Sequence, residues 1–440
     1  MKRTWAWVAA LIVIAAAAQA AEYHVSPAGD DQNAGTPEKP FKSIEQGVAL
    51  LKPGDTLLIH AGRYAPFTVR GLQGTAAKPI TIKAAAGEKA IIDRYPAGGM
   101  HTIHLLGTCR YLVFENLEVT DSDPKIEEYR KLDLKQPEDV AAWKKTAAQL
   151  AKDEKQHYRS GIRINPPDMP PQRDRNHSHL VFRRMVVHHL MGYGFTGNGD
   201  NIEFIENHIY DTGYPAEGYA WYMSGNNHIY RGNRVHDCSY GLHLYTQDEK
   251  LDTVSNALVE NNFIYNAGRM FFHASSQKVH GGGSGILLWA PGGHNIIRNN
   301  VLVDDYTGIN LMTKDSLVAN NTVVGGKNGI FSVKSDKPVL RNNTICNNIV
   351  FGSSGPDMTI PEGENITVTH NLVGVDPRFV DAAKMDFHLR ADSPAVDAGA
   401  ELKEVPADIE GRPRPQGKTW DIGAYERPAD GAATKPAPES

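Results

Sequence analysis

Apolar and polar residues alternate in short runs that recur along the chain, and most runs carry an asparagine at the same place. The runs are LVFENLEV at 112–119, IEFIENHIY at 202–210, HIYRGNRVH at 228–236, LVENNFIY at 258–265, IIRNNVLV at 296–303 and LVANNTVV at 317–324. Alternation with a period of two predicts β-strands whose successive side chains point to opposite faces. Repeats of this length that contain strands and no helix predict a β-solenoid, in which each coil buries its apolar face against the next.

The repeated asparagines are expected to form a ladder along the solenoid axis. They are Asn116, Asn207, Asn233, Asn262, Asn300, Asn321 and Asn343, and from Asn207 onward they are separated by 26, 29, 38, 21 and 22 residues. Identical side chains at one position of successive coils can stack and hydrogen-bond to one another. We therefore interpret the ladder as structural, and it indicates which residues of each coil face outward.

The two ends of the mature chain carry motifs of their own. Residues 41–51 have apolar positions at helical spacing that end at Pro53-Gly54, which predicts a short helix covering the first coil. The segment at 23–69 and KPITIKAAAGEKAIID at 78–93 resemble the N-terminal cap of exported right-handed parallel β-helix proteins of the pectate-lyase-like superfamily, which include the family nine polysaccharide lyases. DPRFVDAAKMDFHLRADSPAVDAGA at 376–400 and DIEGRPRPQGKTWDIGAYE at 408–426 resemble the C-terminal cap.

This resemblance implies an all-β fold, one right-handed parallel β-helix with an N-terminal helical cap and a helical insertion. It is specific for the fold and not for the activity, because lyases, hydrolases and epimerases share it. The expected organisation is a signal peptide at 1–20, a cap with the first coils at 21–100, the β-helix at 101–375 with a helical insertion at 124–158, a C-terminal cap at 376–427 and a disordered tail at 428–440.

The first twenty residues predict export. They have a basic start, an apolar run and Ala18-Gln19-Ala20, a small-x-small cleavage pattern, so the mature protein should be secreted or periplasmic. No later stretch is long and apolar enough to span a membrane. The three cysteines are too few for a disulfide scaffold and are expected to be buried. The net charge of −5 gives no electrostatic footprint for nucleic acid, and we expect a monomer.

One strand of each coil is expected to carry the substrate, because it does so in the proteins that the chain resembles. Alternation turns Ile162, Phe195, Trp221, Leu242, Ile286, Ile309 and Ile330 inward. The outward column is then His104, Arg163, Thr196, Tyr222, His243, Leu287, Asn310 and Phe331. A second outward column, two residues further on, is Leu106, Asn165, Asn198, Ser224, Tyr245, Trp289, Met312 and Val333.

The centre of these columns is polar, aromatic and cationic, which suits an acidic sugar chain because rings stack on sugar faces and arginine pairs with carboxylates. Turns beside the columns are expected to add histidines, and the long turn FFHASSQKVHGGG to add a lysine and a histidine. The residues expected to bind substrate are Asn165, Asn198, Trp289, His189, His236, Lys278 and His280. The irregular segments at 124–158 and 166–177 are expected to build a wall over one patch.

The residue types favour β-elimination on a uronic acid. That reaction needs a cation or amide to stabilise the enolate at the carboxyl group, a base for the C5 proton and an acid for the leaving oxygen. Arg163 or Asn165, His243, and Tyr222 or Tyr245 fit these roles in that order. Glycoside hydrolysis needs two facing carboxylates, and only turn residues supply any: Asp211, Asp237, Asp248, Asp304 and Asp305.

The catalytic motif of the family nine lyases is not matched. Those enzymes use a calcium site of clustered aspartates and a lysine base, whereas the outward columns contain no aspartate cluster. A calcium site formed by Asp237, Asp304 and Asp305 is an alternative, and no metal site is assigned. Lys278 is the candidate for a lysine base. A hydrolase, a C5-epimerase and a non-catalytic glycan-binding β-helix remain as alternatives.

Overall fold

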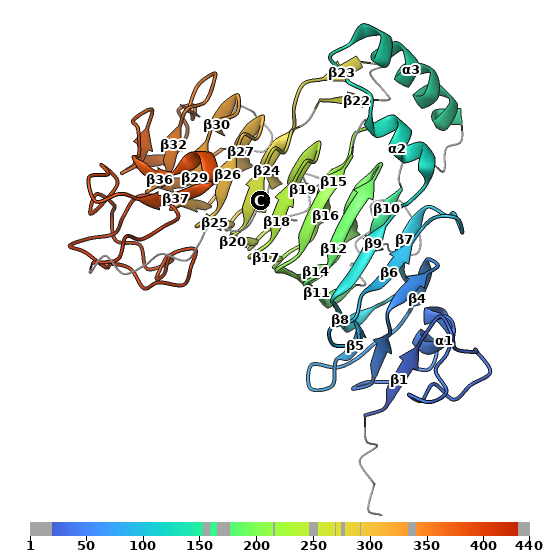
Figure 1. Cartoon of the computed structure of the whole chain (residues 1–440). Coiled ribbons are helices and arrows are strands. Elements are labelled where there is room, and N and C mark those ends of the chain that lie inside the picture. The colour runs from blue at the N-terminus through green and yellow to red at the C-terminus, as the bar shows by residue number, and fades with distance from the viewer. Residues whose placement is uncertain are drawn as a thin grey trace, which may run out of the picture.

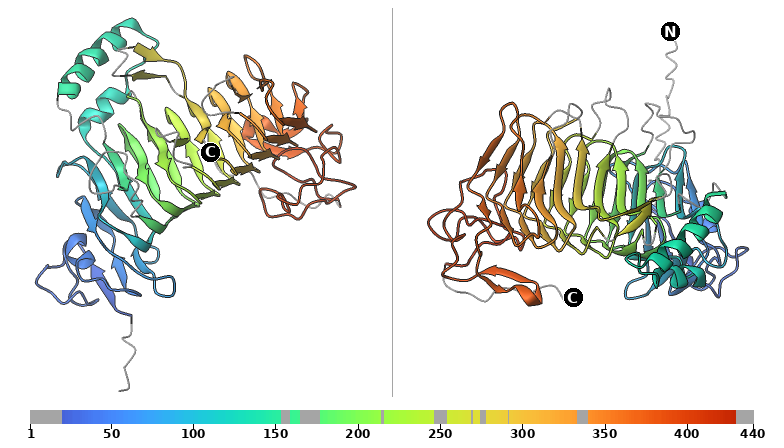
Figure 2. Two further views of the ribbon diagram at one scale, coloured as in Figure 1. Left: turned by 180° about the vertical axis from the view of Figure 1, so that it is seen from behind. Right: turned by 90° about the horizontal axis from the view of Figure 1, so that it is seen from above.

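The computed structural model describes residues 20–152, 159–164, 177–213, 216–245, 254–268, 270–273, 278–290, 292–332 and 340–429. Residues 1–19 of the predicted signal peptide and 430–440 of the predicted tail lie outside them. The chain winds into a stack of coils whose strands line up in three long parallel sheets (Figure 1). The views from behind and from above show one elongated stack (Figure 2). The predicted parallel β-helix is therefore confirmed.

Each coil passes through sheets A, B and C in turn. Sheet A consists of β1 (Glu22–Val25), β2 (Thr56–Ile59), β5 (Ile80–Ala84), β8 (Arg110–Glu115), β11 (Ser178–Arg183), β14 (Asp200–Ile205), β17 (Ile229–Arg231), β20 (Leu258–Glu260), β25 (Ile296–Arg298), β28 (Leu317–Ala319), β31 (Thr344–Cys346) and β34 (Thr367–Thr369). Sheet B consists of β3 (Gly62–Tyr64), β6 (Ala90–Asp93), β9 (Leu117–Thr120), β12 (Val186–Leu190), β15 (His208–Thr212), β18 (Arg234–His236), β21 (Phe263–Tyr265), β26 (Val301–Val303), β29 (Thr322–Val324), β32 (Ile349–Phe351) and β35 (Leu372–Val373). Sheet C consists of β4 (Phe67–Arg70), β7 (His101–Leu106), β10 (Ser160–Ile164), β13 (Tyr193–Asn198), β16 (Tyr219–Ser224), β19 (Tyr240–Tyr245), β24 (Ser284–Ala290), β27 (Thr307–Thr313), β30 (Asn328–Phe331) and β33 (Met358–Thr359).

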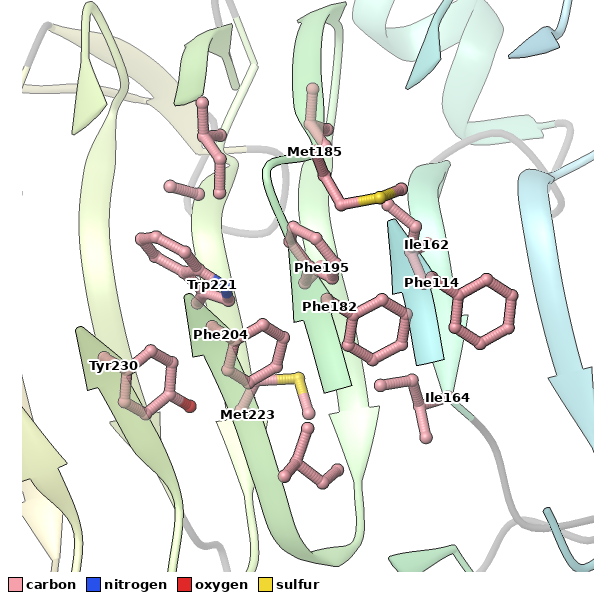
Figure 3. Packing of buried hydrophobic residues seen from close by; sticks show 14 of the residues in the cluster. Phe114, Ile162, Ile164, Phe182, Met185, Phe195, Phe204, Trp221, Met223 and Tyr230 are labelled. Carbon is pink, nitrogen blue, oxygen red and sulfur yellow. The ribbon is translucent and has the colours of Figure 1, made fainter. Parts of the chain in front are cut away.

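The core is a column of stacked coils, and its register follows the predicted alternation. In sheet C, Ile162 pairs with Phe195 and Phe195 with Trp221, and all three are at most 1% exposed. Sheet A adds a stack of rings from neighbouring coils, with the Phe114 and Phe182 centroids 5.0 Å apart (Figure 3). Each coil thus covers the apolar side chains of the one before it, so the repeat needs no second core.

The asparagine ladder is present, with two corrections to its membership. The Nδ2 of Asn233 donates to the Oδ1 of Asn262 at 2.8 Å, and equivalent bonds link Asn207, Asn233, Asn262, Asn300, Asn321, Asn348 and the half-buried Asn371. Asn116 is exposed, with φ of 58°, and lies one position before the place that the ladder asparagines occupy in the same turn. Asn343 belongs to a different turn, where its Oδ1 accepts from the backbone N–H of Ser316. The prediction of Asn343 was wrong because two turns of the coil use asparagine, and that of Asn116 because two neighbouring positions of the ladder's own turn do.

Helices cover one end and one corner of the stack. Helix α1 (Ile44–Val48) begins at Ser43, whose side chain accepts from the N–H of Gln46, and it packs against the first coils. Helices α2 (Pro124–Arg130) and α3 (Pro137–Lys152) pack together with the antiparallel hairpin of β22 (Phe271–His273) and β23 (Lys278–His280) (Figure 1). We call α2, α3 and this hairpin the lobe.

The C-terminal cap runs along the outside of sheet B instead of closing the last coil. Strands β36 (Phe379–Asp381) and β37 (Asp386–Leu389) flank the short helix η1 (Ala382–Lys384). Phe387 and Tyr425 are buried against Phe263 and Val303 of sheet B. Cys109, Cys238 and Cys346 are buried and free, as expected. None of the helices in the described residues is long and apolar enough to cross a membrane.

Candidate functional site on sheet C

The outward face of sheet C carries the two predicted columns in register. Arg163 pairs with Thr196, Thr196 with Tyr222, and Tyr222 with His243 on successive parallel strands. In the second column, Asn198 pairs with Ser224 and Tyr245 pairs with Trp289. Alternation along each strand therefore places most of the predicted site residues on one surface. Asn165 lies outside the described residues.

His243 lies at the centre of this face inside a group of tyrosine rings. Its ring centroid is 5.2 Å from those of Tyr219, Tyr222 and Tyr245. The side chain is only 6% exposed, and neither ring nitrogen has a hydrogen-bond partner among the described residues. Leaving a buried polar atom unpaired costs about 1–3 kcal/mol, and such atoms concentrate at functional sites. Burial lowers the pKa of His243 to about 3, so the imidazole is neutral at pH 7.

A row of tyrosines that the sequence reasoning did not include closes one side of this group. Tyr193 stacks on Tyr219 with centroids 5.5 Å apart, and Tyr219 stacks on Tyr240 at 4.5 Å. Each of these tyrosines begins a strand of sheet C. The sequence signal that could have revealed the row is the tyrosine that opens each of the segments YGFTGNG, YAWYMSG and YGLHLYTQ. Alternation alone would turn these rings inward, but they lie at the corner of the coil.

Glu217 brings a carboxylate to this row and was also missed. The Tyr219 hydroxyl donates to its Oε1 at 2.6 Å. Burial, together with the Glu217 charge, raises the pKa of Tyr219 and raises that of Tyr240 to about 12. Both hydroxyls therefore stay protonated in the unliganded protein, where they can act as hydrogen-bond donors.

The first strands of sheet C carry cationic and imidazole groups. The Nη1 of Arg163 donates to the Oγ1 of Thr196 at 3.2 Å, which holds the guanidinium along the sheet. The ring of His104 lies 4.7 Å from that of His101. Burial lowers the pKa of His101 to about 3 and that of His104 to about 4, and the charge of Arg163 adds to both shifts.

The lobe joins the solenoid at the corner between sheets B and C. Trp143 of α3 is buried with Ile126 of α2 and Met191, and Met191 lies in the turn from sheet B to sheet C. Phe271 of the hairpin contacts Tyr240 with centroids 5.5 Å apart. The lobe therefore borders the tyrosine row. The segment at 166–176, expected to share in this wall, lies outside the described residues.

His189 and His236 are not on this face. Both were expected in turns bordering it, but His189 lies in β12 and His236 in β18 of sheet B. These two strands extend beyond their apolar residues Val187 and Val235 and so include the histidines. His236 stacks between Tyr210 and Tyr265, with centroids 5.1 and 4.6 Å away. This placement corrects the expectation that they line the same surface as His243.

Lys278 and His280 lie in β23 of the lobe, both exposed. The His280 ring stacks on Phe271 at 5.8 Å, so the hairpin is linked through Phe271 to the tyrosine row. Trp289 meets Tyr245 edge-on at 5.9 Å and extends the ring cluster by one coil. Their roles in binding stay predictions.

Two of the turn aspartates have charged or imidazole partners of their own, and Asp248 lies outside the described residues. Asp211 forms an ion pair with Arg130, and Asp237 accepts from His236 Nδ1 at 2.8 Å. Asp305 is 2% exposed, and burial raises its pKa. No group of three or more His, Cys, Asp or Glu side chains in the described part of the chain is arranged to hold a metal ion. The residues that were open for calcium do not converge.

Two depressions lie elsewhere on the surface. One of about 460 Å³ lies on sheet B beside Lys89, Glu118, His188 and Tyr210. The other, of about 280 Å³, lies on the C-terminal cap beside Arg378 and Arg390. Neither includes an outward residue of sheet C. An extended polymer can bind along an open sheet face, so the absence of sheet C from these depressions does not count against it.

Sequence comparisons give short matches. A model of the family described as periplasmic copper-binding protein (NosD) matches residues 270–374. "Pectate lyase PEL9" of Emericella nidulans is 38% identical over 76 residues, which is 17% of this chain and 18% of the relative. "Uncharacterized protein YwoF" of Bacillus subtilis is 37% identical over 70 residues, 16% of this chain and 15% of the relative. Each alignment thus spans less than a fifth of the curated relative.

Structural comparisons cover nearly the whole chain. The crystal structure of pectate lyase Pel9A superposes with a TM-score of 0.63 at 18% identity and covers 92% of this chain and 96% of that chain. The fold is the right-handed parallel β-helix of the pectate lyases. The complex of XylC with xylose covers 92% and 98% with a TM-score of 0.55 and 13% identity. Identities this low show that the β-helix is shared, and the chemistry of this one must be argued from its own residues.

Proposed function

We propose that the protein is an exported, polysaccharide-active enzyme, a lyase that cleaves a uronic-acid-containing glycan on the outward face of sheet C. The observation that carries the proposal is His243, which is buried among tyrosines and has no partner on either ring nitrogen. A solenoid that only had to fold would place an apolar or a paired residue there. Export rests on the predicted signal peptide, and the family whose model matches residues 270–374 is described as periplasmic.

In this proposal Arg163 pairs with the uronate carboxylate and stabilises the negative charge that develops when the C5 proton leaves. His243 takes that proton, and the hydroxyl of Tyr222 or Tyr245 protonates the leaving oxygen. The low pKa of His243 in the unliganded protein would make it a weak base. An opposite charge close by favours the protonated imidazole, so a uronate bound beside His243 raises the pKa of this residue and makes it a stronger base.

Hydrolysis is the second candidate, and Glu217 is the observation in its favour. Its carboxylate accepts from Tyr219 beside the ring cluster. A glycosidase mechanism of the usual kind needs a second carboxylate facing it, and the described outward positions of sheet C supply none. Glu217 alone therefore supports hydrolysis less well than the His243 group supports elimination.

The test is an incubation of the mature protein with pectic, alginate and glycosaminoglycan polymers. Ultraviolet absorbance from the unsaturated uronyl end reports elimination, and a reducing-end assay reports either reaction. We expect absorbance that His243→Gln removes and that His370→Gln, which changes an exposed histidine directly after β34 of sheet A, retains. New reducing ends without absorbance would assign hydrolysis, and inertness on all polymers would favour a glycan-binding protein.

A further inference from the structure

The two ends of the solenoid are finished differently. At the N-terminal end, helix α1 packs against the first coils, and its Ile44 and Val48 are buried there. At the other end, none of residues 352–376, all of which the structure describes, is buried. This last coil contains β33, β34 and β35, and each of them is an end strand of its sheet. One side of the last coil is therefore open, with three unpaired strand edges.

Apolar side chains face this open side. Val368 pairs with Ile345 and Val373 with Val350, so both valines continue inward rows of the core. Ile345 and Val350 are at most 1% exposed, whereas Val368 is 47% and Val373 37% exposed. The two valines are exposed because no following coil covers them. A solenoid needs terminal units with a polar outer face to stay soluble on its own, and this end presents an apolar one.

The C-terminal cap does not supply the missing cover. The N–H of Gly423 donates to the backbone O of Asn347, and Tyr425 packs against Phe263, several coils earlier. The cap thus runs away from the open side as it approaches residue 429. The sequence that follows, DGAATKPAPES at 430–440, contains no Val, Leu, Ile, Met or aromatic residue with which to cover apolar surface.

We propose that the open side binds the same side of a second copy of this chain, so that two solenoids join end to end about a twofold axis. The longest of the three free edges is β34, which then pairs with its copy in the antiparallel sense and brings both Val368 side chains into one shared core. Because α1 closes the opposite end, assembly stops at two copies. A dimer replaces the monomer expected from the sequence, which did not show that the last coil stays open.

The size and the charges of this surface fit a second copy. A stable interface takes roughly 20–30 residues from each side, and the last coil, residues 352–376, falls within that range. Glu362 and Glu364 precede β34 and His370 follows it, and all three are exposed. In an antiparallel pair, the segment before the strand in one copy lies beside the segment after the strand in the other. The carboxylates then face an imidazole and not each other, which favours the pairing.

The experiment is sedimentation velocity of the mature protein between about 1 and 100 µM, where we expect a dimer with a dissociation constant of about 1 µM or below. Val368→Asp should raise this constant at least about 100-fold, because it would bury two unpaired carboxylates side by side. Glu364→Lys should raise it several-fold by replacing attraction with repulsion. Leu50→Asp adds the same charge at a 39% exposed side chain of the opposite end and should leave the constant unchanged.

A protein that is monomeric at all of these concentrations would overturn the inference. So would a dimer that Val368→Asp leaves intact, or one that Leu50→Asp weakens as much, because the N-terminal end would then take part. Thermal unfolding at the lowest concentration checks that each variant is folded. If Val368→Asp does not fold, Glu364→Lys decides, since its side chain is exposed in the single copy: weaker association supports the twofold pairing, and an unchanged constant overturns it.

Discussion

Sheets A and C have the same strand geometry but use their outward polar side chains differently. On sheet A, Glu260 is 4% exposed and accepts from Arg231 Nε at 2.5 Å and Arg298 Nε at 2.8 Å. Glu115 is buried in the same way between Arg183 and Arg184. The two arginines lower its pKa although its burial acts in the opposite direction. Sheet A pairs its charges with one another.

Sheet C leaves polar atoms without partners within the described structure. Side chains in its outward columns with such buried atoms are His104, Asn198, His243 and Asn310. Unpaired groups of this kind are costly, so a surface selected only for stability would not accumulate them along one sheet. The difference supports the proposal that sheet C, and not sheet A, is the face that meets a ligand.

The largest expected effect is on catalysis at sheet C. Removing one hydroxyl, in Tyr222→Phe or Tyr245→Phe, should lower kcat by about 10²- to 10⁴-fold for whichever residue is the acid, because general acid catalysis contributes that much. The other variant should lose much less. Tyr265→Phe on sheet B is the matched control, and the rate of unsaturated-end formation is the measurement. Equal, small losses in both variants would remove the tyrosines from the mechanism.

The next effect is on stability at sheet A. Glu260→Ala leaves Arg231 and Arg298 without their shared carboxylate and should lower the free energy of unfolding by about 3 kcal/mol. Activity at a temperature where the variant is folded should not change. Glu206→Ala is the control, because that side chain is 58% exposed and its loss should cost under about 1 kcal/mol in urea unfolding. A loss of kcat in folded Glu260→Ala would break the distinction between the sheets.

The sequence predicted the fold well because the coil repeats one physical requirement, an apolar side chain at alternate positions. It predicted the outward columns for the same reason. It misassigned Asn343 because its neighbours in sequence resemble those of the ladder, and only the position within the coil separates the two turns. It placed His236 in a turn because strand ends are poorly marked by polar residues.

The sequence predicted the direction in which His243 points better than the depth to which this side chain is buried. Alternation predicts that His243 faces outward, and it does. The rings that enclose it come from Tyr219 and Tyr240, which begin their strands at the corner of the coil, and from Tyr222 and Tyr245. Because enclosure depends on side chains from two coils and a corner, no single strand pattern reveals it.

That enclosure has a consequence for acid stability. Burial holds the folded-state pKa of His243 at about 3, below the usual value of 6.5. The unfolded chain therefore binds a proton that the folded chain does not, and stability falls as the pH decreases from 6.5 toward 3. Between pH 7 and 4.5 this one residue should cost about 2–3 kcal/mol of the free energy of unfolding.

His243→Gln should remove that part of the pH dependence. Urea unfolding at pH 7 and 4.5 measures it, and His280→Gln, the same substitution at an exposed position, is the matched control. His101 and His104 have lowered pKa values for the same reason, so a residual slope of the same sign is expected. An unchanged slope in His243→Gln would show that the imidazole is accessible to protons in the folded state.

The smallest effect should come from the lobe. Lys278 and His280 are exposed on β23, and the sequence predicts that both bind substrate. Exposed substitutions usually change a free energy by no more than about 0.5 kcal/mol, so Lys278→Ala should change KM roughly twofold at most. Trp289→Ala, in the ring-lined part of sheet C, should raise KM more, since a ring contact contributes about 0.5–1.5 kcal/mol beyond its buried area. If Lys278→Ala raised KM more than Trp289→Ala, or abolished kcat, the catalytic surface would extend from sheet C onto the lobe, and Lys278 would replace His243 as the leading candidate for the base.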